Sequence, residues 1–316
     1  MTWPRVAVLG AGAVGCYYGG MLARAGAPVT LIGRPAHVSA IERDRLLLET
    51  LGFTERVAVG ASTAVEAARG ARLVLFCVKS TDTDAAVREL APYLDAGSIV
   101  LSMQNGVDNL ERIRAVVDVP AFAAVVYVAA AMAGPGHVRH TGRGDLVIGA
   151  VEADVQAKRA ARPLLQEVAG WLERAGVPCV VSDNVEGELW AKLLINCAYN
   201  AISALGRARY RRIGAHPQAL GVLKDAVREV IAVAQAAGVR LPEGDLVEAA
   251  CRISQSMAGA TSSTAQDIAR GRRTEIDHLN GYVVRQGEAL GVPTPVNRTL
   301  HALVKLLEDA AADEAR

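Results

Sequence analysis

Apolar runs alternate with longer stretches of helical period over the first third of the chain. Continuous apolar runs predict buried strands at residues 5–10, 28–33, 71–79 and 98–106. Helix-like stretches separate them, for instance residues 14–26. Continuous β-branched runs separated by helices are typical of a parallel sheet covered on both faces. The pattern therefore predicts an α/β fold that begins with a doubly wound, Rossmann-type sheet.

The pattern changes between residues 121 and 148. Apolar stretches there are interrupted by turn signals at Pro135–Gly136 and at residues 142–144, which predicts a strand, a hairpin and a second strand. We expect this pair to extend the sheet in antiparallel fashion. A helix near residues 158–175 and a last strand at residues 178–183 follow.

Beyond residue 184 only helical periodicity remains. It covers residues 185–205, 216–238 and 267–291, where apolar positions recur at the spacing of an α-helix. The sequence therefore predicts two domains: a Rossmann-type domain over residues 1–183 and an all-helical domain over residues 184–316.

Composition narrows the range of partners. The 316 residues carry a formal net charge of +1 and 4% aromatic side chains, which argues against nucleic acid as a partner. No apolar run reaches the roughly 18 residues that a membrane-spanning helix needs, and no secretory signal pattern follows Met1, so no membrane association is expected. The five cysteines are scattered and form no Cys-x-x-Cys pair. They favour a reducing compartment, and we expect a cytoplasmic protein.

A glycine motif follows the first predicted strand. Gly10, Gly12 and Gly15 have the spacing Gly-x-Gly-x-x-Gly and stand where the strand turns into a helix. In dinucleotide-binding folds the first glycine permits the turn, the second lets the backbone approach a pyrophosphate, and the third lets helix and strand pack closely. A plain tight turn is the alternative, but this context favours dinucleotide binding.

The end of the second strand bears on which dinucleotide is bound. NAD sites usually carry an acidic residue about 20 residues after the glycine motif, and residues 30–35 contain none. Arg34 stands there instead, and a guanidinium pairs with phosphate through two hydrogen bonds. We therefore favour NADP(H) over NAD, with a solvated surface arginine as the alternative.

Two further strand ends carry polar side chains. Lys79 follows the strand at 71–79 and Asn105 follows the strand at 98–106, and the carboxyl ends of parallel strands face the ligand crevice. Lys79 is a candidate cofactor contact or a surface lysine. Asn105 reaches the nicotinamide or substrate, or else belongs to an ordinary Asn-Gly turn.

The helix predicted at residues 185–205 carries a polar stripe on an apolar background. Lys192, Asn196 and Asn200 recur every four residues and so share one face. Lys192 either extends its ammonium group to solvent or lies in a cleft as a proton donor. Two asparagines on the same stripe favour the cleft, because buried amides need partners.

These motifs and several others occur together in one known family. They are GAGAVG at 10–15, VKS at 78–80, QNG at 104–106, PGHVRHTG at 135–142, WAKLLINCAYN at 190–200 and RRTEIDHLNG at 272–281. With them, nearly the whole chain resembles the ketopantoate reductases (2-dehydropantoate 2-reductases). The resemblance implies NADPH-dependent reduction of 2-dehydropantoate, a small 2-oxo acid, on the way to pantothenate and coenzyme A.

The resemblance also implies roles for individual residues. Lys192 is the general acid and Glu275 the second catalytic residue, which holds the substrate hydroxyl. Asn105, Asn196, Asn200 and Ser263 bind the substrate. The implied cofactor contacts are Gly10, Ala11, Gly12, Ala13, Val14, Gly15, Arg34, Lys79, Asn105 and Glu275.

Several points stay open at this level. Two alternatives to the reduction of 2-dehydropantoate remain. The same catalytic residues could reduce another 2-oxo acid, or the protein could be a non-catalytic NADP-binding sensor. His278 stands where an aromatic residue is expected, which bears on the substrate pocket. We expect no metal site, and we interpret His137 and His140 as surface residues. The helical domain would allow a homodimer. Arg270, Arg272 and Arg273 are cleft or surface residues, and we favour the surface for at least one of them.

Overall fold

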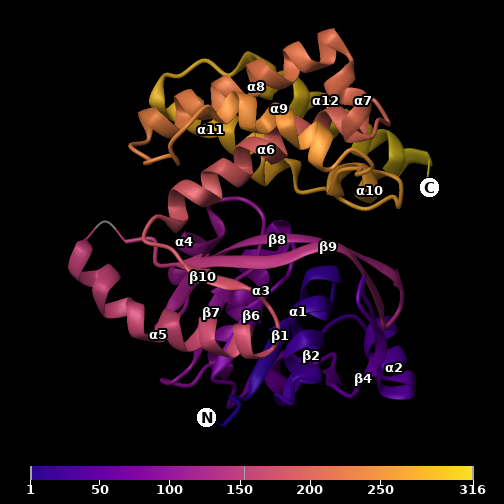
Figure 1. Ribbon diagram of the computed structural model, residues 1–316, viewed down its shortest axis with the longest axis vertical. Helices are drawn as coiled ribbons and strands as arrows, with labels where there is room; N and C mark the ends of the chain where they lie inside the picture. Colours follow the sequence, from indigo (N-terminus) through magenta and orange to yellow (C-terminus); the bar gives the residue numbers. More distant parts are fainter. Residues whose placement is uncertain (1, 153, 315–316) are drawn as a thin grey trace. The chain divides into compact units, whose positions relative to one another are not determined.

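The computed structural model describes residues 2–152 and 154–314 (Figure 1). The chain divides into two compact units, Met1–Val185 and Glu186–Arg316. The predicted fold class is confirmed: a Rossmann-like sheet unit comes first and a helical unit follows.

A ten-stranded sheet forms the first unit within residues 2–152 and 154–185. Its order is β4-β3-β9-β8-β7-β6-β1-β2-β5, and β10 lies beside β9. The strands are β1 (Val6–Leu9), β2 (Val29–Ile32), β3 (Leu46–Glu49), β4 (Thr54–Val57), β5 (Gly60–Ser62), β6 (Leu73–Phe76), β7 (Ile99–Ser102), β8 (Ala121–Gly134), β9 (His137–Gly149) and β10 (Cys179–Val181).

Six neighbouring strands have the order of a dinucleotide-binding fold. From one side they run β5, β2, β1, β6, β7 and β8, and all their pairings are parallel. Numbered along the chain among themselves, this is 3-2-1-4-5-6, the doubly wound order. The order reverses between β1 and β6, so a ligand is expected beyond the carboxyl ends of these two strands.

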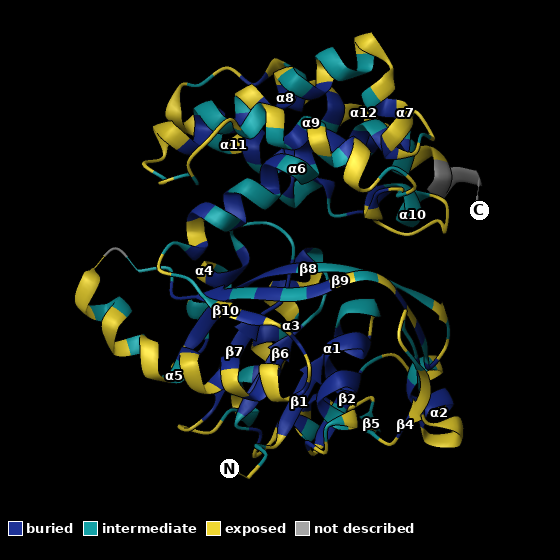
Figure 2. Ribbon diagram, in the orientation of Figure 1, coloured by how far each residue is buried: buried dark blue, intermediate teal, exposed yellow. Residues whose placement is uncertain are grey.

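Helices cover the faces of this sheet. Helix α1 packs on β2, β3, β8 and β9, and α5 packs on β9 and β10. The central strands are fully buried because apolar side chains face both layers, whereas the outer side of α5 is exposed (Figure 2). The helices are α1 (Ala13–Arg24), α2 (Pro35–Asp44), α3 (Thr83–Leu90), α4 (Asn109–Arg114) and α5 (Val155–Arg174), with short 3-10 turns η1 (Val65–Ala68), η2 (Ser80–Asp82) and η3 (Ala91–Tyr93).

The long hairpin β8–β9 is antiparallel, as predicted, but one of its two expected turns is absent. The chain reverses at Pro135–Gly136, between the two strands. Residues 142–144 instead stay within β9, where the pairing with β8 shifts register. Arg143 and Gly144 both have positive φ there, 54° and 133°. The glycines mark a β-bulge, which the sequence signal does not distinguish from a turn.

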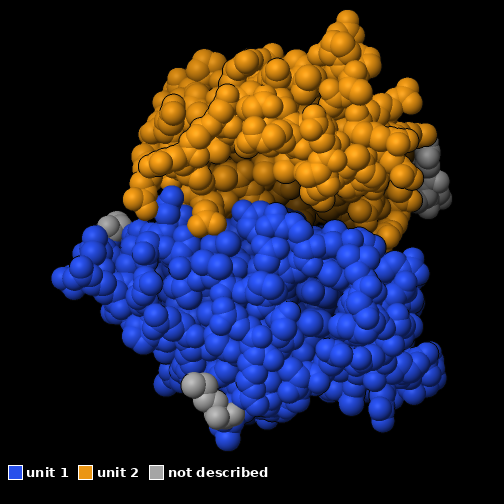
Figure 3. Space-filling view, viewed as in Figure 1, with its two compact units in different colours: residues 1–185 blue, residues 186–316 orange. Residues whose placement is uncertain are grey.

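Helices alone form the second unit within its described residues (orange in Figure 3). They are α6 (Val185–Leu205, whose first residue belongs to the first unit), α7 (Tyr210–Ala215), α8 (Pro217–Ala236), α9 (Leu246–Ser256), α10 (Ser263–Ile268), α11 (Asn280–Leu290) and α12 (Pro295–Glu314), with the 3-10 turn η4 (Ile276–His278). Ala201, Ala226, Ile276, Leu300 and Val304 form a shared apolar core of α6, α8, η4 and α12.

Polar side chains also tie these helices together. Glu229 of α8 accepts hydrogen bonds from the backbone N–H groups of Val296 and Asn297 at 2.8 and 2.9 Å. A carboxylate at this position satisfies free N–H groups at the start of α12 and faces the positive end of its dipole. Asn297 in turn accepts from Asn280 at 2.9 Å, which links the start of α11 to the same point.

The single helical stretch predicted over residues 267–291 is wrong. Helix α10 ends at Ile268, residues 269–275 form a turn, and η4 follows before α11 begins at Asn280. Gly271 has φ of 60° and Leu279 has backbone angles of −111° and −104°, so neither residue continues an α-helix. Apolar residues at helical spacing therefore serve two different elements here.

Candidate active site

The glycine motif occupies the turn from β1 into α1, and two of its glycines are required by the fold itself. Gly10 has φ of 110°, and a Cβ there would lie 2.6 Å from the backbone carbon of Cys77. A Cβ on Gly15 would lie 2.2 Å from the Gly10 carbonyl oxygen. These positions let the turn close and let α1 pack against β1.

Gly12 differs from the other two glycines. A Cβ built there meets no atom within 4 Å, and its φ of −88° is open to any residue. It precedes α1 without any side-chain cap, and the first N–H groups of an α-helix have no partner within the helix. Glycine is not needed here for packing, which fits a site where a pyrophosphate approaches the backbone.

Arg34 and Lys79 flank this region on neighbouring segments of the first unit. Arg34 is exposed and directly precedes α2, just beyond the end of β2. Lys79 is half-buried and directly precedes η2, just beyond β6. Both lie past the carboxyl ends of their strands, which is the edge where a doubly wound fold binds its ligand.

Asn105 lies at the same level of the sheet as Lys79. Phe76 of β6 is paired with Ser102 of β7, and Lys79 and Asn105 each stand three residues farther along. Gly106 follows with φ of 93°, a backbone conformation that favours glycine, and turns the chain away. The Asn-Gly pair is therefore a real turn, and its asparagine lies beside the Lys79 segment.

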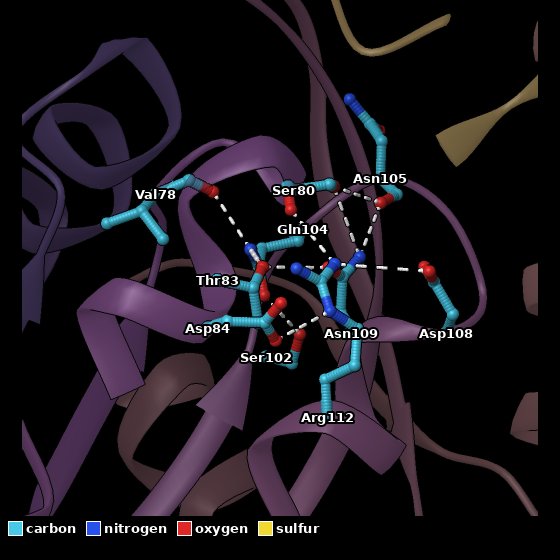
Figure 4. A network of polar contacts seen from close by, with 10 residues as sticks. All are labelled: Val78, Ser80, Thr83, Asp84, Ser102, Gln104, Asn105, Asp108, Asn109 and Arg112. Atoms are coloured by element: carbon cyan, nitrogen blue, oxygen red, sulfur yellow. Dashed lines mark hydrogen bonds and ion pairs between the residues drawn. The ribbon is translucent and has the colours of Figure 1, made fainter. Parts of the chain in front are cut away.

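Hydrogen bonds join these two strand ends (Figure 4). The Asn105 carbonyl oxygen accepts from Ser80 Oγ at 2.8 Å and from Asn109 Nδ2 at 2.7 Å. Gln104 Nε2 donates to the Val78 carbonyl oxygen at 3.1 Å. Ser80 and Asn109 are not among the predicted site residues. The sequence signals for this network are the motifs VKS at 78–80, which contains Ser80, and QNG at 104–106, which contains Gln104.

Helix α6 carries the predicted polar stripe of the second unit. Lys192 and Asn196 are half-buried, one turn apart, while Asn200 is almost fully buried. Asn200 Nδ2 lies 3.5 Å from Ser263 Oγ at the start of α10. The structure thus brings together two predicted substrate-binding residues that are 63 positions apart in sequence.

Ser262 holds this pair in place. Its hydroxyl donates to the Asn200 carbonyl oxygen at 3.1 Å and accepts from the Ala265 N–H at 3.0 Å. The second contact makes Ser262 the N-cap of α10. Ser263 is the next residue, with its own side chain exposed.

Glu275 lies in the turn before η4, between two anchored residues. Thr274 is fully buried, and its N–H donates to Glu308 Oε1 at 2.6 Å. Ile276, also fully buried, donates its N–H to Thr274 Oγ1 at 3.2 Å. Glu275 is half-buried, and the buried neighbours on both sides fix its backbone.

Asp277 fastens the same turn to α12. Its carboxylate pairs with His301 Nε2 at 2.7 Å and with Lys305 Nζ at 3.0 Å. The hydrogen bond from His301, with that from Lys305, holds the pKa of Asp277 well below its usual range, although partial burial acts in the opposite direction. Asp277 is therefore ionised in the folded protein at all but strongly acidic pH.

The remaining charged residues of this segment differ in exposure. Arg270, Arg272 and Arg273 are exposed, and Arg273 approaches Asp277 at 3.7 Å, with 67% of its side chain accessible. An exposed pair of this kind contributes little to stability. His278, at the position where an aromatic residue is expected, is half-buried.

The interpretation of His140 as a surface residue is wrong. His140 is buried, and its ring stacks on Tyr17 of α1 with centroids 4.4 Å apart. Its Nε2 lies 2.5 Å from the Arg143 carbonyl oxygen in the bulge. His137 is partly exposed and pairs with Glu49. Alternation along the strand turns these two histidines differently, and Tyr17 of α1 covers the second.

The described residues form neither a metal-binding cluster nor a membrane-spanning helix. Over residues 2–152 and 154–314, no group of three or more histidine, cysteine, aspartate or glutamate side chains is placed to hold a metal ion. Within the same ranges, no helix is both long and apolar enough to cross a membrane. All five cysteines are free, and burial raises the pKa of Cys16 to about 12.

Both parts of the chain match models of one family. Residues 6–153 match "Ketopantoate reductase PanE/ApbA", and residues 184–308 match "Ketopantoate reductase PanE/ApbA C terminal". The 2-dehydropantoate 2-reductase of Halobacterium salinarum is 34% identical over 309 residues, which cover 96% of this chain and 99% of that protein.

Solved structures agree with this match. A PanE/ApbA family ketopantoate reductase from Ralstonia eutropha JMP134 is 53% identical, with a TM-score of 0.90 over 98% of this chain and 99% of its own. A D-mandelate dehydrogenase solved with NADH and anilino(oxo)acetate is 24% identical, with a TM-score of 0.89 over 98% of this chain and 99% of its own. At that identity the second likeness concerns the fold alone.

Proposed function

The chain belongs to the ketopantoate reductase family, and from this premise we propose that it reduces 2-dehydropantoate to pantoate with NADPH. The observation that carries the proposal is the match of both units to that family over residues 6–153 and 184–308. Pantoate made in this way serves the synthesis of pantothenate and coenzyme A.

Lys192 is the proposed general acid. When bound, the nicotinamide would supply a hydride to the carbonyl carbon of the substrate. Negative charge then develops on the carbonyl oxygen, and the Lys192 ammonium group donates a proton to that oxygen. An ammonium group placed there also stabilises the developing charge, which is greater in the transition state than in the bound substrate.

The other polar residues of the second unit hold the acid. Asn200 and Ser263, 3.5 Å apart, offer an amide and a hydroxyl for its polar groups. Asn196 lies one turn from Lys192 on α6, and Glu275 is proposed to accept a hydrogen bond from the substrate hydroxyl. A carboxylate acceptor favours acids that carry this hydroxyl, because an acid without it cannot form the hydrogen bond.

The first unit is proposed to hold the cofactor. The backbone of residues 10–15 and the start of α1 take the pyrophosphate, and Arg34 and Lys79 take the adenosine phosphate. Asn105 is proposed to contact both cofactor and substrate. The same fold occurs in a D-mandelate dehydrogenase solved with NADH, so the preference for NADPH rests on Arg34 and is tested through it.

One assay separates this function from its alternatives. NADPH oxidation is measured with 2-dehydropantoate, pyruvate, 2-oxoisovalerate and 2-oxoisocaproate. We expect turnover with 2-dehydropantoate well above the other three. A preference for another acid would identify that acid as the substrate instead. NADPH binding without turnover of any acid would indicate a non-catalytic sensor.

The role of Lys192 is tested with a matched pair. Lys192→Ala is expected to lower kcat by about a hundredfold or more, the range of general-acid catalysis, while NADPH affinity stays near normal. Lys224→Ala removes a half-buried lysine from α8 and serves as the control. Wild-type kcat in Lys192→Ala would contradict the general-acid assignment.

A further inference from the structure

A buried network of hydrogen bonds connects the two strand ends that carry Lys79 and Asn105. We propose that Ser80, Gln104 and Asn109 are positioning residues, which set where Asn105 and Lys79 present their side chains to the cofactor. This inference rests on the proposed function of those two residues. None of the three touches the cofactor or substrate in the proposal; they act through the backbone.

The peptide group of Asn105 is fixed by two donors. Its carbonyl oxygen accepts from Ser80 Oγ at 2.8 Å and from Asn109 Nδ2 at 2.7 Å. A carbonyl oxygen has two lone pairs, and both are used here. The peptide plane after Asn105 therefore has one orientation, while the Asn105 side chain points away from the network (Figure 4).

Gln104 extends the same control to the Lys79 segment. Its Nε2 donates to the Val78 carbonyl oxygen at 3.1 Å and to Thr83 Oγ1 at 2.7 Å. Lys79 follows Val78 directly, so its backbone is held from its amino side by Gln104. Because Gln104 also precedes Asn105, one side chain connects the two candidate cofactor contacts.

Thr83 closes the network. Its hydroxyl accepts from Gln104 and donates to Asn109 Oδ1 at 2.9 Å. A hydroxyl that donates and accepts fixes the orientation of both amides, because each must present a different end to it. Asn109 is thereby turned so that its Nδ2 faces the Asn105 carbonyl oxygen.

The burial of the network residues indicates that the network serves to fix the positions of the two strand ends. Ser80 and Thr83 are fully buried, and Gln104 and Asn109 are 5% and 3% exposed. Buried polar groups cost free energy unless all are paired, and apolar side chains would join two parallel strands without that cost. What a hydrogen-bonded network adds is a single geometry.

The opposite end of the same two strands offers a natural control. Ser98 directly precedes β7, is 2% exposed, and donates its Oγ to the Ala71 carbonyl oxygen at 2.8 Å. Ser80 is buried to the same degree and donates at the same distance. The two serines differ in position: Ser98 lies at the amino ends of the strands, and Ser80 lies at the carboxyl ends.

The test compares Ser80→Ala with Ser98→Ala in the full chain. Each hydroxyl donates one hydrogen bond to a carbonyl oxygen and accepts one from an N–H group. Both variants lose two such bonds, so both are expected to lower the thermal midpoint by similar amounts. Only Ser80→Ala is expected to lower kcat, by about tenfold to a hundredfold, the effect of misplacing a positioned group by about 1 Å. The KM for the acid is expected to change less, because most of the proposed contacts to the acid come from the second unit.

A second pair removes the hydroxyl of Thr83 with little change of shape. Thr83→Val loses the link between Gln104 and Asn109, whereas Thr83→Ser keeps it. We expect Thr83→Val to raise the NADPH dissociation constant several-fold and to lower kcat, and Thr83→Ser to restore both towards wild type. Equal effects in the two variants would refute the network's role, because packing alone would then explain them.

The outcomes separate this inference from the proposed function. If the wild type turns over no 2-oxo acid, the proposed function fails, and the NADPH dissociation constants of the same variants still decide the positioning role. If Ser80→Ala keeps wild-type kcat and NADPH affinity, or if Ser98→Ala loses as much of both, the inference is overturned while the proposed function stands.

Discussion

Two glycines of the same motif are expected to respond in opposite ways to the same substitution. Gly12→Ala adds a methyl group where the structure has no atom within 4 Å. Gly15→Ala adds it 2.2 Å from the Gly10 carbonyl oxygen and 2.9 Å from a methyl group of Val8. The first change fills space in front of α1, and the second forces α1 away from β1.

The expected sizes follow from these distances. The backbone of Gly12 is compatible with alanine, so Gly12→Ala is expected to leave stability unchanged or raise it by up to about 1 kcal/mol, because the unfolded chain loses freedom. Overlap in a packed core costs about 1–3 kcal/mol or more, so Gly15→Ala destabilises by at least that much. If a pyrophosphate lies against Gly12, a similar overlap would weaken NADPH binding about tenfold to a hundredfold.

Thermal unfolding without cofactor and NADPH titration by nicotinamide fluorescence measure the two effects separately. Gly12→Ala should match the wild type in the first measurement and fall short in the second. Gly15→Ala should already be lower in the first. Wild-type NADPH affinity in Gly12→Ala would refute the reasoning that Gly12 faces the cofactor. A large loss of stability in Gly12→Ala would show that the space beside Gly12 cannot accommodate a methyl group.

Three further predictions concern charged residues. Arg34→Ala is expected to weaken NADPH binding about tenfold to a hundredfold, which corresponds to the loss of hydrogen bonds to a charged group, and to weaken NADH binding far less. Arg43→Ala, at another exposed arginine, is the control. Equal weakening of the binding of both cofactors would refute the phosphate contact. Asp277→Asn is expected to lower the thermal midpoint at neutral pH. Since the pKa of Asp277 is depressed in the folded state, its contribution is full above about pH 4, its unfolded value, and is lost as the pH falls below that, so the gap between wild type and variant should narrow in acid. Glu229→Gln replaces one acceptor oxygen with an NH2 donor that faces the N–H groups at the start of α12. The free energy of unfolding, measured with urea, is expected to fall by about 1–3 kcal/mol. An unchanged urea midpoint would mean that this cap contributes nothing to stability.

Local sequence signals predicted the elements that depend on local chemistry. The helix at residues 185–205 has the predicted bounds because its apolar spacing is unbroken from Val185 to Leu205. The turn at Pro135–Gly136 and the glycine motif were equally predictable, because proline fixes the backbone angle φ and glycine permits angles that other residues avoid. These features need no knowledge of what packs against them.

Features set by distant contacts were not predictable in the same way. The turn before η4 depends on Glu308, 34 positions from Thr274, so the run from Asp267 to Gly291 resembled one helix. The buried position of His140 depends on Tyr17 lying over the bulge. Strands β4 and β5 are short and partly polar, and the neighbouring strands supply their backbone partners.

The bulge in β9 has a consequence for how this protein behaves at high concentration. Strand β3 pairs with β9 at residues 137–139 and β10 pairs with it at residues 146–148. Between them, the stretch that neither strand covers contains Arg143 and Gly144 at positive φ and the charged pair Arg143–Asp145. A backbone kinked and charged in this way is a poor template for an added strand from another molecule. This edge is thereby protected against the strand-to-strand aggregation to which exposed β-sheets are prone.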